Sequence, residues 1–207
     1  MDERNNMNEK QENKDVKKSS LKEYFSCFKM NTKSIAYNAI IAALYVILTY
    51  AFFFCSYGAI QVRVSEMLMI LVFFNPNYTV GLTIGCLLAN IYSVTAGLTA
   101  MDMLFGTLAT FISCILMSVC KHLLFACLIP AFINGIVIGS EITFLFSNLS
   151  DSREATILWF TNFGYVTAGE IIAISVIGYT LFMFAIKGSK RKILDVIHAK
   201  RNLDFRF

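Results

Sequence analysis

The sequence predicts an all-α integral membrane protein with six transmembrane helices and both termini in the cytoplasm. Three observations lead to this fold class. Hydrophobic residues make up 57% of the 207 residues and the mean hydropathy is +0.61, whereas soluble domains are about 45–50% apolar. Apolar runs long enough to cross ~30 Å of hydrocarbon fill the middle of the chain. Charged residues gather at its two ends.

The positive charges are strongly segregated. Of 18 Lys and Arg residues, eight lie in residues 1–33 and seven in residues 187–207, which leaves only Arg63, Lys121 and Arg153 between them. A soluble fold with this pattern would have almost no polar shell. The net charge of +4 comes from the two ends. Because Lys and Arg prefer the cytoplasmic side of a membrane, that excess does not indicate a nucleic-acid partner.

Hydropathy and charge divide the chain into three parts. Residues 1–33 form a polar cytoplasmic tail whose interleaved charges are typical of disorder. Within it, residues 21–30 combine aromatic side chains with lysines, a pattern that favours a short helix on the membrane surface. Residues 34–186 form the six-helix membrane domain, and residues 187–207 form a basic cytoplasmic tail.

Six apolar segments are predicted in the membrane domain, at residues 35–54, 64–75, 78–95, 101–120, 123–146 and 157–186. The second is short for a full span, so we expect it to be tilted or to cross partially among its neighbours. Six crossings place both tails and Lys121 on the cytoplasmic side and leave Arg63 and Arg153 outside, as the positive-inside rule favours. The outside then carries three connections, at residues 55–63, 95–100 and 147–156.

Small residues recur at intervals of four in three of these segments. The pairs Ala39 and Ala43, Gly81 and Gly85, and Gly135 and Gly139 each lie four residues apart. Lipid provides no hydrophobic drive between helices, so close backbone approach at small residues is the usual means of packing. Such pairs mostly indicate helix contacts inside the domain, and a single pair can instead mark a surface for a partner.

Polar residues within the apolar segments fall toward the outer side of the membrane. They include Arg63, Glu66, Asn90, Asp102, Asn134, Glu141, Asn162, Tyr165 and Glu170. Ionisable residues in a membrane segment are costly and often functional. The group therefore predicts one pocket that opens outward.

Each of these residues also has a structural interpretation. Arg63 and Glu66 form an i, i+3 pair, and Asn90 and Asn134 are suited to interhelical hydrogen bonds. Glu141 and Glu170 are harder to explain in this way, since Arg63 and Arg153 are the cations on their side of the membrane. A buried carboxylate must be protonated, hydrated or in contact with a ligand.

Catalytic functions are not indicated, and the chain is expected not to be an enzyme. His122 and His198 are the two histidines, both on the cytoplasmic side, so no paired metal ligands or catalytic base are predicted. The six cysteines form no CxxC pair and are expected to act as small hydrophobic residues. No phosphate-binding GK[ST] loop is present either. We predict no cofactor and no metal site.

Several motifs resemble the QueT family of small substrate-binding S components of energy-coupling factor (ECF) transporters. They are residues 58–66 (GAIQVRVSE), residues 73–76 (FFNP), residues 81–90 (GLTIGCLLAN), and Asp102 followed by residues 105–110 (FGTLAT). The resemblance extends over about residues 34–186 and is looser in the fifth and sixth segments.

This resemblance implies six transmembrane helices with both termini cytoplasmic. It also implies a queuosine precursor, a deazaguanine base, as the substrate, and as partners a membrane T component and two cytoplasmic ATPases. In S components an Ala-x-x-x-Ala pattern on the first helix faces the T component. Ala39 and Ala43 are therefore expected at a partner interface.

The chemistry of a deazaguanine base fits the predicted site residues. A carboxylate can accept hydrogen bonds from both N1–H and N2–H, and a second can pair with the ammonium of the aminomethyl form. The candidate carboxylates are Glu66, Glu141 and Glu170, with Arg63 beside them. Asn90, Asn134 or Asn162 is suited to the carbonyl edge, and Tyr57, Tyr165 or Trp159 to stacking on the ring. The alternative is a standalone proton-coupled carrier that uses Glu141 and Glu170 as a relay.

Overall fold

The computed structural model describes residues 31–56, 62–95, 100–146 and 152–199, and helices account for nearly all of them. No strand occurs in these ranges. The elements are α2 (Thr32–Ala51), α3 (Phe53–Ser56), η1 (Val64–Met69), α4 (Ile70–Phe74), α5 (Tyr78–Thr95), α6 (Ala100–Val119), α7 (Leu123–Phe146), α8 (Ser152–Glu170), η2 (Ile171–Gly178) and α9 (Tyr179–Val196). Each predicted segment coincides with a helix or a run of helices.

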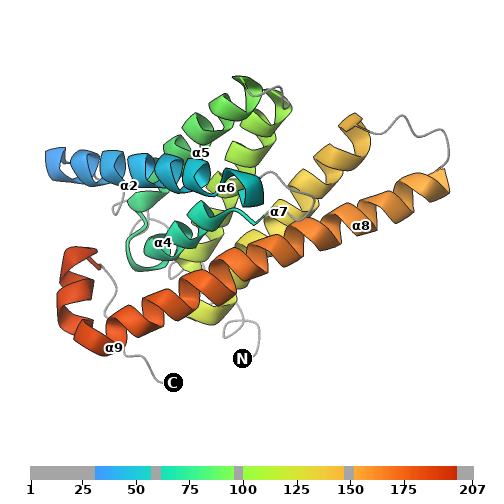
Figure 1. The fold of residues 1–207 in the computed structure, drawn as a ribbon. Helices are drawn as coiled ribbons and strands as arrows, with labels where there is room; N and C mark the ends of the chain where they lie inside the picture. The colour runs from blue at the N-terminus through green and yellow to red at the C-terminus, as the bar shows by residue number, and fades with distance from the viewer. Residues whose placement is uncertain (1–30, 57–61, 96–99, 147–151, 200–207) are drawn as a thin grey trace, which may run out of the picture.

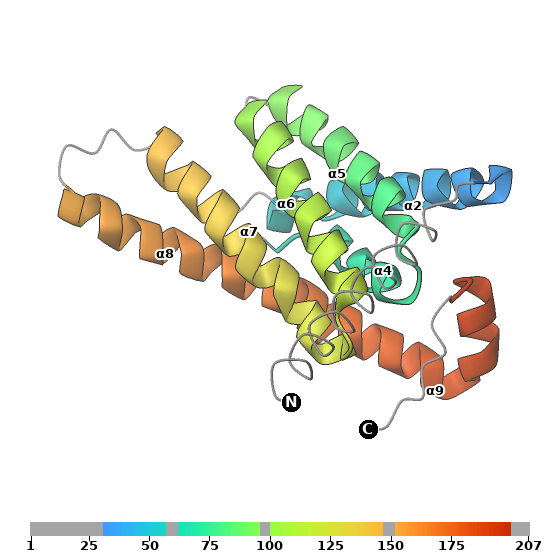
Figure 2. The same ribbon diagram turned by 180° about the vertical axis from the view of Figure 1, so that it is seen from behind.

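The helices pack largely in chain order around a short central segment. Neighbouring contacts join α5 to α6, α6 to α7 and α7 to α8, while α2 lies against α5 (Figure 1 and Figure 2). The central segment consists of η1 and α4, which contact α2, α5, α6, α7 and η2. The short second segment of the sequence is therefore the centre of the fold rather than a peripheral crossing.

The residues of this central segment explain its position. Met69, Val72, Phe73 and Phe74 are fully buried, as is nearly all of Ile70. A helix that is apolar on all faces is stable only when other helices surround it. Its 11 residues, 64–74, are too few for a helix that crosses ~30 Å of hydrocarbon.

Three helical stretches are long and apolar enough to cross a membrane. They are Thr32–Ala51, Leu123–Phe144 and Ser152–Gly188, and the shorter apolar helices are Val64–Phe74, Tyr78–Ile91 and Met103–Val119. The protein is thus an all-helical membrane protein. The count of six crossings and the cytoplasmic position of both termini remain predictions.

The last helical stretch begins earlier than predicted. Residues 147–156 were expected to form an outer loop, but α8 already begins at Ser152. The Thr156 hydroxyl donates to the Ser152 carbonyl at 2.9 Å, one turn back. Arg153 and Glu154 are good helix formers, although their charge lowers the local hydropathy. Hydropathy therefore marks the apolar part of this helix and not its start.

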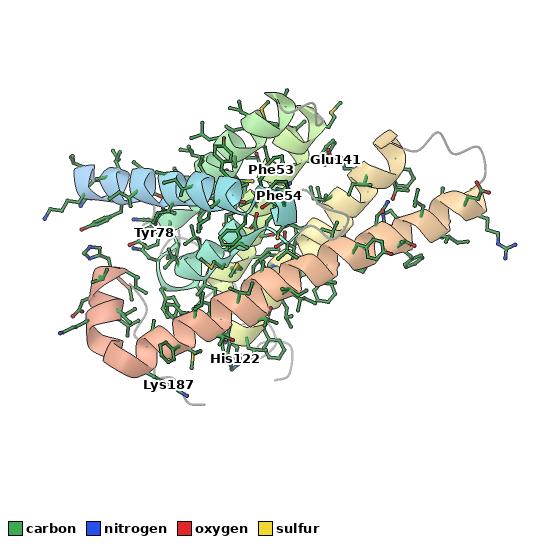
Figure 3. All side chains as sticks on the ribbon, in the orientation of Figure 1. Phe53, Phe54, Tyr78, His122, Glu141 and Lys187 are labelled. Carbon is green, nitrogen blue, oxygen red and sulfur yellow. The ribbon has the colours of Figure 1, made fainter. Side chains whose placement is uncertain are left out.

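The end of α9 returns to the bundle. Its ribbon turns near Lys187 (Figure 3). The Tyr78 hydroxyl donates to the Ile197 carbonyl (2.9 Å), and the Asn75 amide donates to the His198 carbonyl (3.1 Å). Three apolar side chains from this end pack against the core: Leu194, Ile197 and Ala199. Part of the predicted C-terminal tail is therefore helical, while residues 1–30 lie outside the described residues.

Close packing of α2 on α5 depends on two glycines. A methyl carbon on Gly85 would lie 2.8 Å from Cβ of Tyr45 and 3.1 Å from Cα of Ala42. On Gly81 it would lie 2.6 Å from the carbonyl oxygen of Asn38. The predicted small-residue contact of the third segment is thus a contact with the first.

We expect Gly85→Ala to lower the free energy of unfolding by about 1–3 kcal/mol, because the backbone of α2 must move to admit the methyl group. Gly164→Ala on α8 is the matched control, since no atom lies within 4 Å of its added carbon. The control should be neutral or slightly stabilising. Equal thermal stability of the two purified variants in detergent would contradict the importance of this contact.

Candidate binding site

Six of the eight predicted binding residues are buried inside the bundle. They are Arg63, Glu66, Asn90, Asn134, Glu141 and Glu170, each 5% exposed or less. They come from η1 and its N-terminal flank, from α5, from α7 and from the end of α8. Burial of charged groups is costly unless hydrogen bonds or opposite charges accompany it, so the partners of these residues decide what the site can do.

Glu66 lies at the centre of the group. The hydroxyl of Tyr45 on α2 donates to Oε1 of Glu66 at 2.5 Å, and the hydroxyl of Thr110 on α6 donates to the same oxygen at 3.4 Å. Oε2 has no hydrogen-bond partner among the residues that the structure describes. One carboxylate oxygen is therefore held by the protein, and the other can accept a hydrogen bond from a ligand.

Side chains of α5 and α6 complete the surroundings of Glu66. The Thr110 hydroxyl and the Asn90 amide both approach the sulfur of Cys86, at 3.3 and 3.6 Å. A methyl carbon on Gly106 would lie 2.9 Å from Nδ2 of Asn90 and 3.5 Å from a guanidinium nitrogen of Arg63. The absence of a side chain at Gly106 thus leaves room for the polar groups of Asn90 and Arg63.

Glu170 approaches from the other side of the bundle, at the last residue of α8. The Asn134 amide on α7 donates to its Oε1 at 2.8 Å, while Oε2 has no partner among the described residues. Arg63 and Glu66 lie at the start of η1, which packs against η2, the element that follows Glu170 directly. We call Arg63, Glu66, Asn90, Asn134 and Glu170 the carboxylate cluster.

Two local irregularities accompany Glu170 and Asn134. The chain is π-helical from Ile171 to Gly178, directly after Glu170, and Pro130 lies inside α7, one turn before Asn134. Proline removes a backbone hydrogen bond from the helix, and short π-helical stretches are frequent at functional sites. A π-helical stretch thus follows Glu170, and a proline precedes Asn134 by one turn.

The other predicted residues lie farther along α7 and α8. Glu141 is two turns, or about 10 Å, from Asn134 on the same face of α7, and Figure 3 labels it near the end of that helix. Asn162 donates to the Thr143 hydroxyl at 3.0 Å. Tyr165 is 48% exposed on α8 and does not join the cluster.

The predicted stacking residues are likewise outside the carboxylate cluster. The Trp159 ring stacks on Phe163 with centroids 5.4 Å apart, and its indole N–H donates to the Ser140 hydroxyl at 2.8 Å. Tyr57 and the side chain of Asp102 lie outside the described part of the structure. Trp159 therefore joins α8 to α7.

Sequence reasoning missed Tyr45, Thr110 and Cys86, which surround Glu66. These side chains are neutral hydroxyl and thiol groups on apolar helices, so charge does not mark them in the sequence. A signal was nonetheless present for Tyr45. It lies seven residues after Asn38 and four before Thr49, so all three fall on one face of α2.

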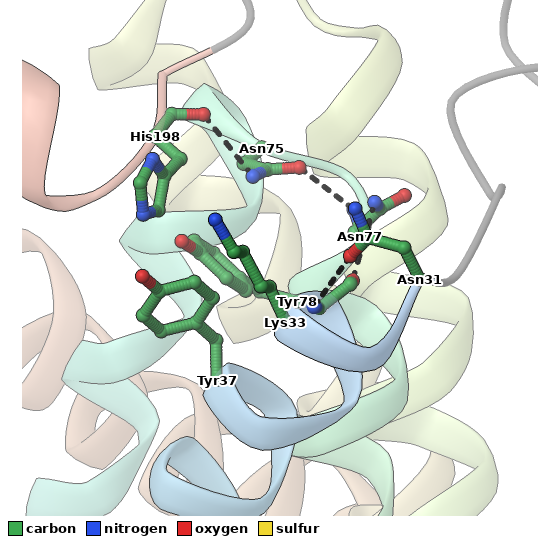
Figure 4. Close-up of a pocket in the computed structure, with 8 residues that line it drawn as sticks. Asn31, Lys33, Tyr37, Asn75, Asn77, Tyr78 and His198 are labelled. Carbon is green, nitrogen blue, oxygen red and sulfur yellow. Dashed lines mark hydrogen bonds between the residues drawn. The ribbon is translucent and has the colours of Figure 1, made fainter.

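A separate hollow of about 220 Å³ lies among the start of α2, the turn between α4 and α5, and the chain end after α9 (Figure 4). It shares no residue with the carboxylate cluster. Its lining residues are Asn31, Lys33, Ser34, Tyr37, Asn75, Asn77, Tyr78 and His198. We place the candidate site at the carboxylate cluster because the buried acceptor oxygens lie there.

Comparison with known proteins matches the chain to a family of transporters. The QueT transporter family matches residues 35–187, which include the whole carboxylate cluster. A relative named queuosine precursor transporter QueT, from Lactococcus lactis subsp. cremoris, is 45% identical over 86 residues. That match spans 41% of this chain and 48% of the relative, about half its length. No solved structure matches. The chain belongs to the QueT transporter family and is a multi-pass membrane protein.

Proposed function

We propose that the protein is a substrate-binding subunit that captures a queuosine precursor, a deazaguanine base, from outside the cell. The observation that carries this proposal is the pair of buried carboxylates, Glu66 and Glu170, each with one oxygen held by the protein and one without a partner among the described residues. The name of the Lactococcus relative supports the choice of substrate.

The donor groups of the base match these acceptors. One carboxylate oxygen can accept from the N1–H and N2–H edge of a deazaguanine, and a second carboxylate can pair with the ammonium of the aminomethyl form. Asn90 and Asn134 are the nearby amides for the carbonyl edge. Such a ligand would provide hydrogen-bond donors for the second oxygens of Glu66 and Glu170. Its ammonium would add one positive charge beside Arg63 and these two acids.

Transport is proposed to be driven by partners, a membrane T component and two cytoplasmic ATPases of the ECF type. The 207 residues contain no GK[ST] phosphate loop. Ala39 and Ala43, four residues apart on α2, are both exposed and are not among the buried residues of that helix. Exposed small residues at this spacing are suited to close contact with another helix in the membrane.

The proposed substrate can be tested by ligand-dependent thermal stabilisation of the purified protein. We expect 7-aminomethyl-7-deazaguanine to stabilise it, by about 2.7 kcal/mol at 100 times the dissociation constant. Unsubstituted 7-deazaguanine should bind more weakly because it lacks the ammonium. Adenine should have no effect because it lacks the N1–H and N2–H donor edge. No stabilisation by any deazaguanine, in protein that melts cooperatively, would contradict the proposed substrate.

A further inference from the structure

The inner face of α2 contacts the elements that carry the carboxylate cluster. Its buried residues are Asn38, Ile41, Ala42, Tyr45 and Thr49. Asn38 accepts a hydrogen bond from the Gly81 backbone N–H at 2.6 Å, which joins α2 to α5. Two and three turns further along, Tyr45 and Thr49 face η1, the element that carries Glu66.

Two buried hydrogen bonds join α2 to η1. Tyr45 donates to Glu66, and the Thr49 and Ser65 hydroxyls are hydrogen-bonded to each other at 2.8 Å. All four residues are 2% exposed or less. η1 is a 3₁₀ helix of six residues, and the hydrogen bonds within such a helix have poorer geometry than those of an α-helix. Contacts from outside therefore contribute much of what holds Glu66 in place.

We infer that Tyr45 is a positioning residue for substrate binding, an inference that rests on the proposed function. Its hydroxyl and that of Thr110 fix Oε1 of Glu66, so that Oε2 is presented to the base in one orientation. Tyr45 itself does not contact the base. Because Tyr45 belongs to α2, the orientation of Glu66 depends on where α2 lies.

A double-mutant cycle tests this role. The dissociation constant of 7-aminomethyl-7-deazaguanine is measured for the wild type, Tyr45→Phe, Glu66→Gln and the double variant. We expect Tyr45→Phe to weaken binding by about 10-fold in the wild-type background and by less than about 2-fold when Glu66 is already glutamine. A residue that matters only for packing would weaken binding by the same factor in both backgrounds.

Tyr78→Phe is the matched control. It also removes a buried tyrosine hydroxyl, which donates to the Ile197 carbonyl, but it lies in the turn region away from the carboxylate cluster. Its affinity should equal that of the wild type. If Tyr45→Phe does not yield folded protein, Thr49→Val tests the second link from α2 to η1, and weaker binding is again expected.

The outcomes separate this inference from the proposed function. Equal effects of Tyr45→Phe in both backgrounds, or unchanged affinity in Tyr45→Phe, would overturn the positioning role and leave the substrate assignment intact. If Thr49→Val is used instead of Tyr45→Phe, an affinity equal to that of the wild type would overturn the positioning role. Absence of binding by the wild type would overturn the proposed function and this inference with it.

Discussion

Replacing Glu66 or Glu170 with glutamine should weaken binding of 7-aminomethyl-7-deazaguanine by about 10- to 100-fold, and the protein should still fold. The expected size follows from a hydrogen bond to a charged group, worth about 1.5–3 kcal/mol. Glutamine preserves the shape and the Oε1 acceptor, which Tyr45 and Thr110 use at Glu66 and Asn134 uses at Glu170. The substitution replaces the second oxygen, an acceptor, with an NH2 donor and removes the negative charge.

The two variants can also show which carboxylate pairs with the ammonium. The variant at that position should lose the preference for the aminomethyl form over unsubstituted 7-deazaguanine. The other variant should lose affinity for both bases by a similar factor. Glu141→Gln was expected from the sequence to act in the same way, and it belongs in the same series.

Affinity is measured by titration of the purified variants, and thermal melting without ligand confirms that they fold. Glu154→Gln is the matched control, because Glu154 is an exposed acid on α8. It should bind like the wild type. Wild-type affinity in both Glu66→Gln and Glu170→Gln would show that the carboxylate cluster does not contact the base.

Much of this site was predictable from intramembrane polarity. Glu66, Asn134 and Glu170 are costly in an apolar helix, so their presence alone marks them, and the structure places them in the interior. The sequence did not show that Tyr165 lies outside this group of residues. It lies five residues before Glu170, which is about 140° around a helix with 3.6 residues per turn. The two side chains therefore face different directions on α8.

The arrangement around Glu66 was less predictable, since it depends on which helices meet. Tyr45 and Thr110 lie 21 and 44 residues from Glu66 in the chain, and nothing local to either residue indicates a carboxylate partner. The central position of η1 and α4 is likewise a consequence of packing. Hydropathy showed that residues 64–75 were short for a crossing, but not that five other elements would surround them.

Bulky residues at Ala39 and Ala43 should abolish uptake of the base and leave its binding to the isolated protein unchanged. Both alanines are exposed on α2 and lie four residues apart, so they share one face of the helix. Larger side chains there would extend from an exposed part of the α2 surface. They would, however, prevent the close helix contact that we propose with the T component.

The double variant Ala39→Leu/Ala43→Leu is assayed for binding after purification and for uptake in cells that contain the partner ATPases. Ala168→Leu, at an exposed alanine on α8, is the control and should retain uptake. Ala42→Leu tests a small residue on the buried face of the same helix. Ala42 is buried beside Gly85, so this change should lower thermal stability instead of acting on uptake alone.

The same assay distinguishes the two modes of transport. Uptake that survives the change at Ala39 and Ala43 would contradict the proposed interface. Uptake that needs no ATPase and follows the proton gradient would favour a standalone carrier with Glu141 and Glu170 as its relay.

In an ECF-type cycle, α2 has two roles on opposite faces. We propose that Ala39 and Ala43 contact the partner and that Tyr45 holds Glu66. A substitution on the outer face should then impair transport without impairing capture.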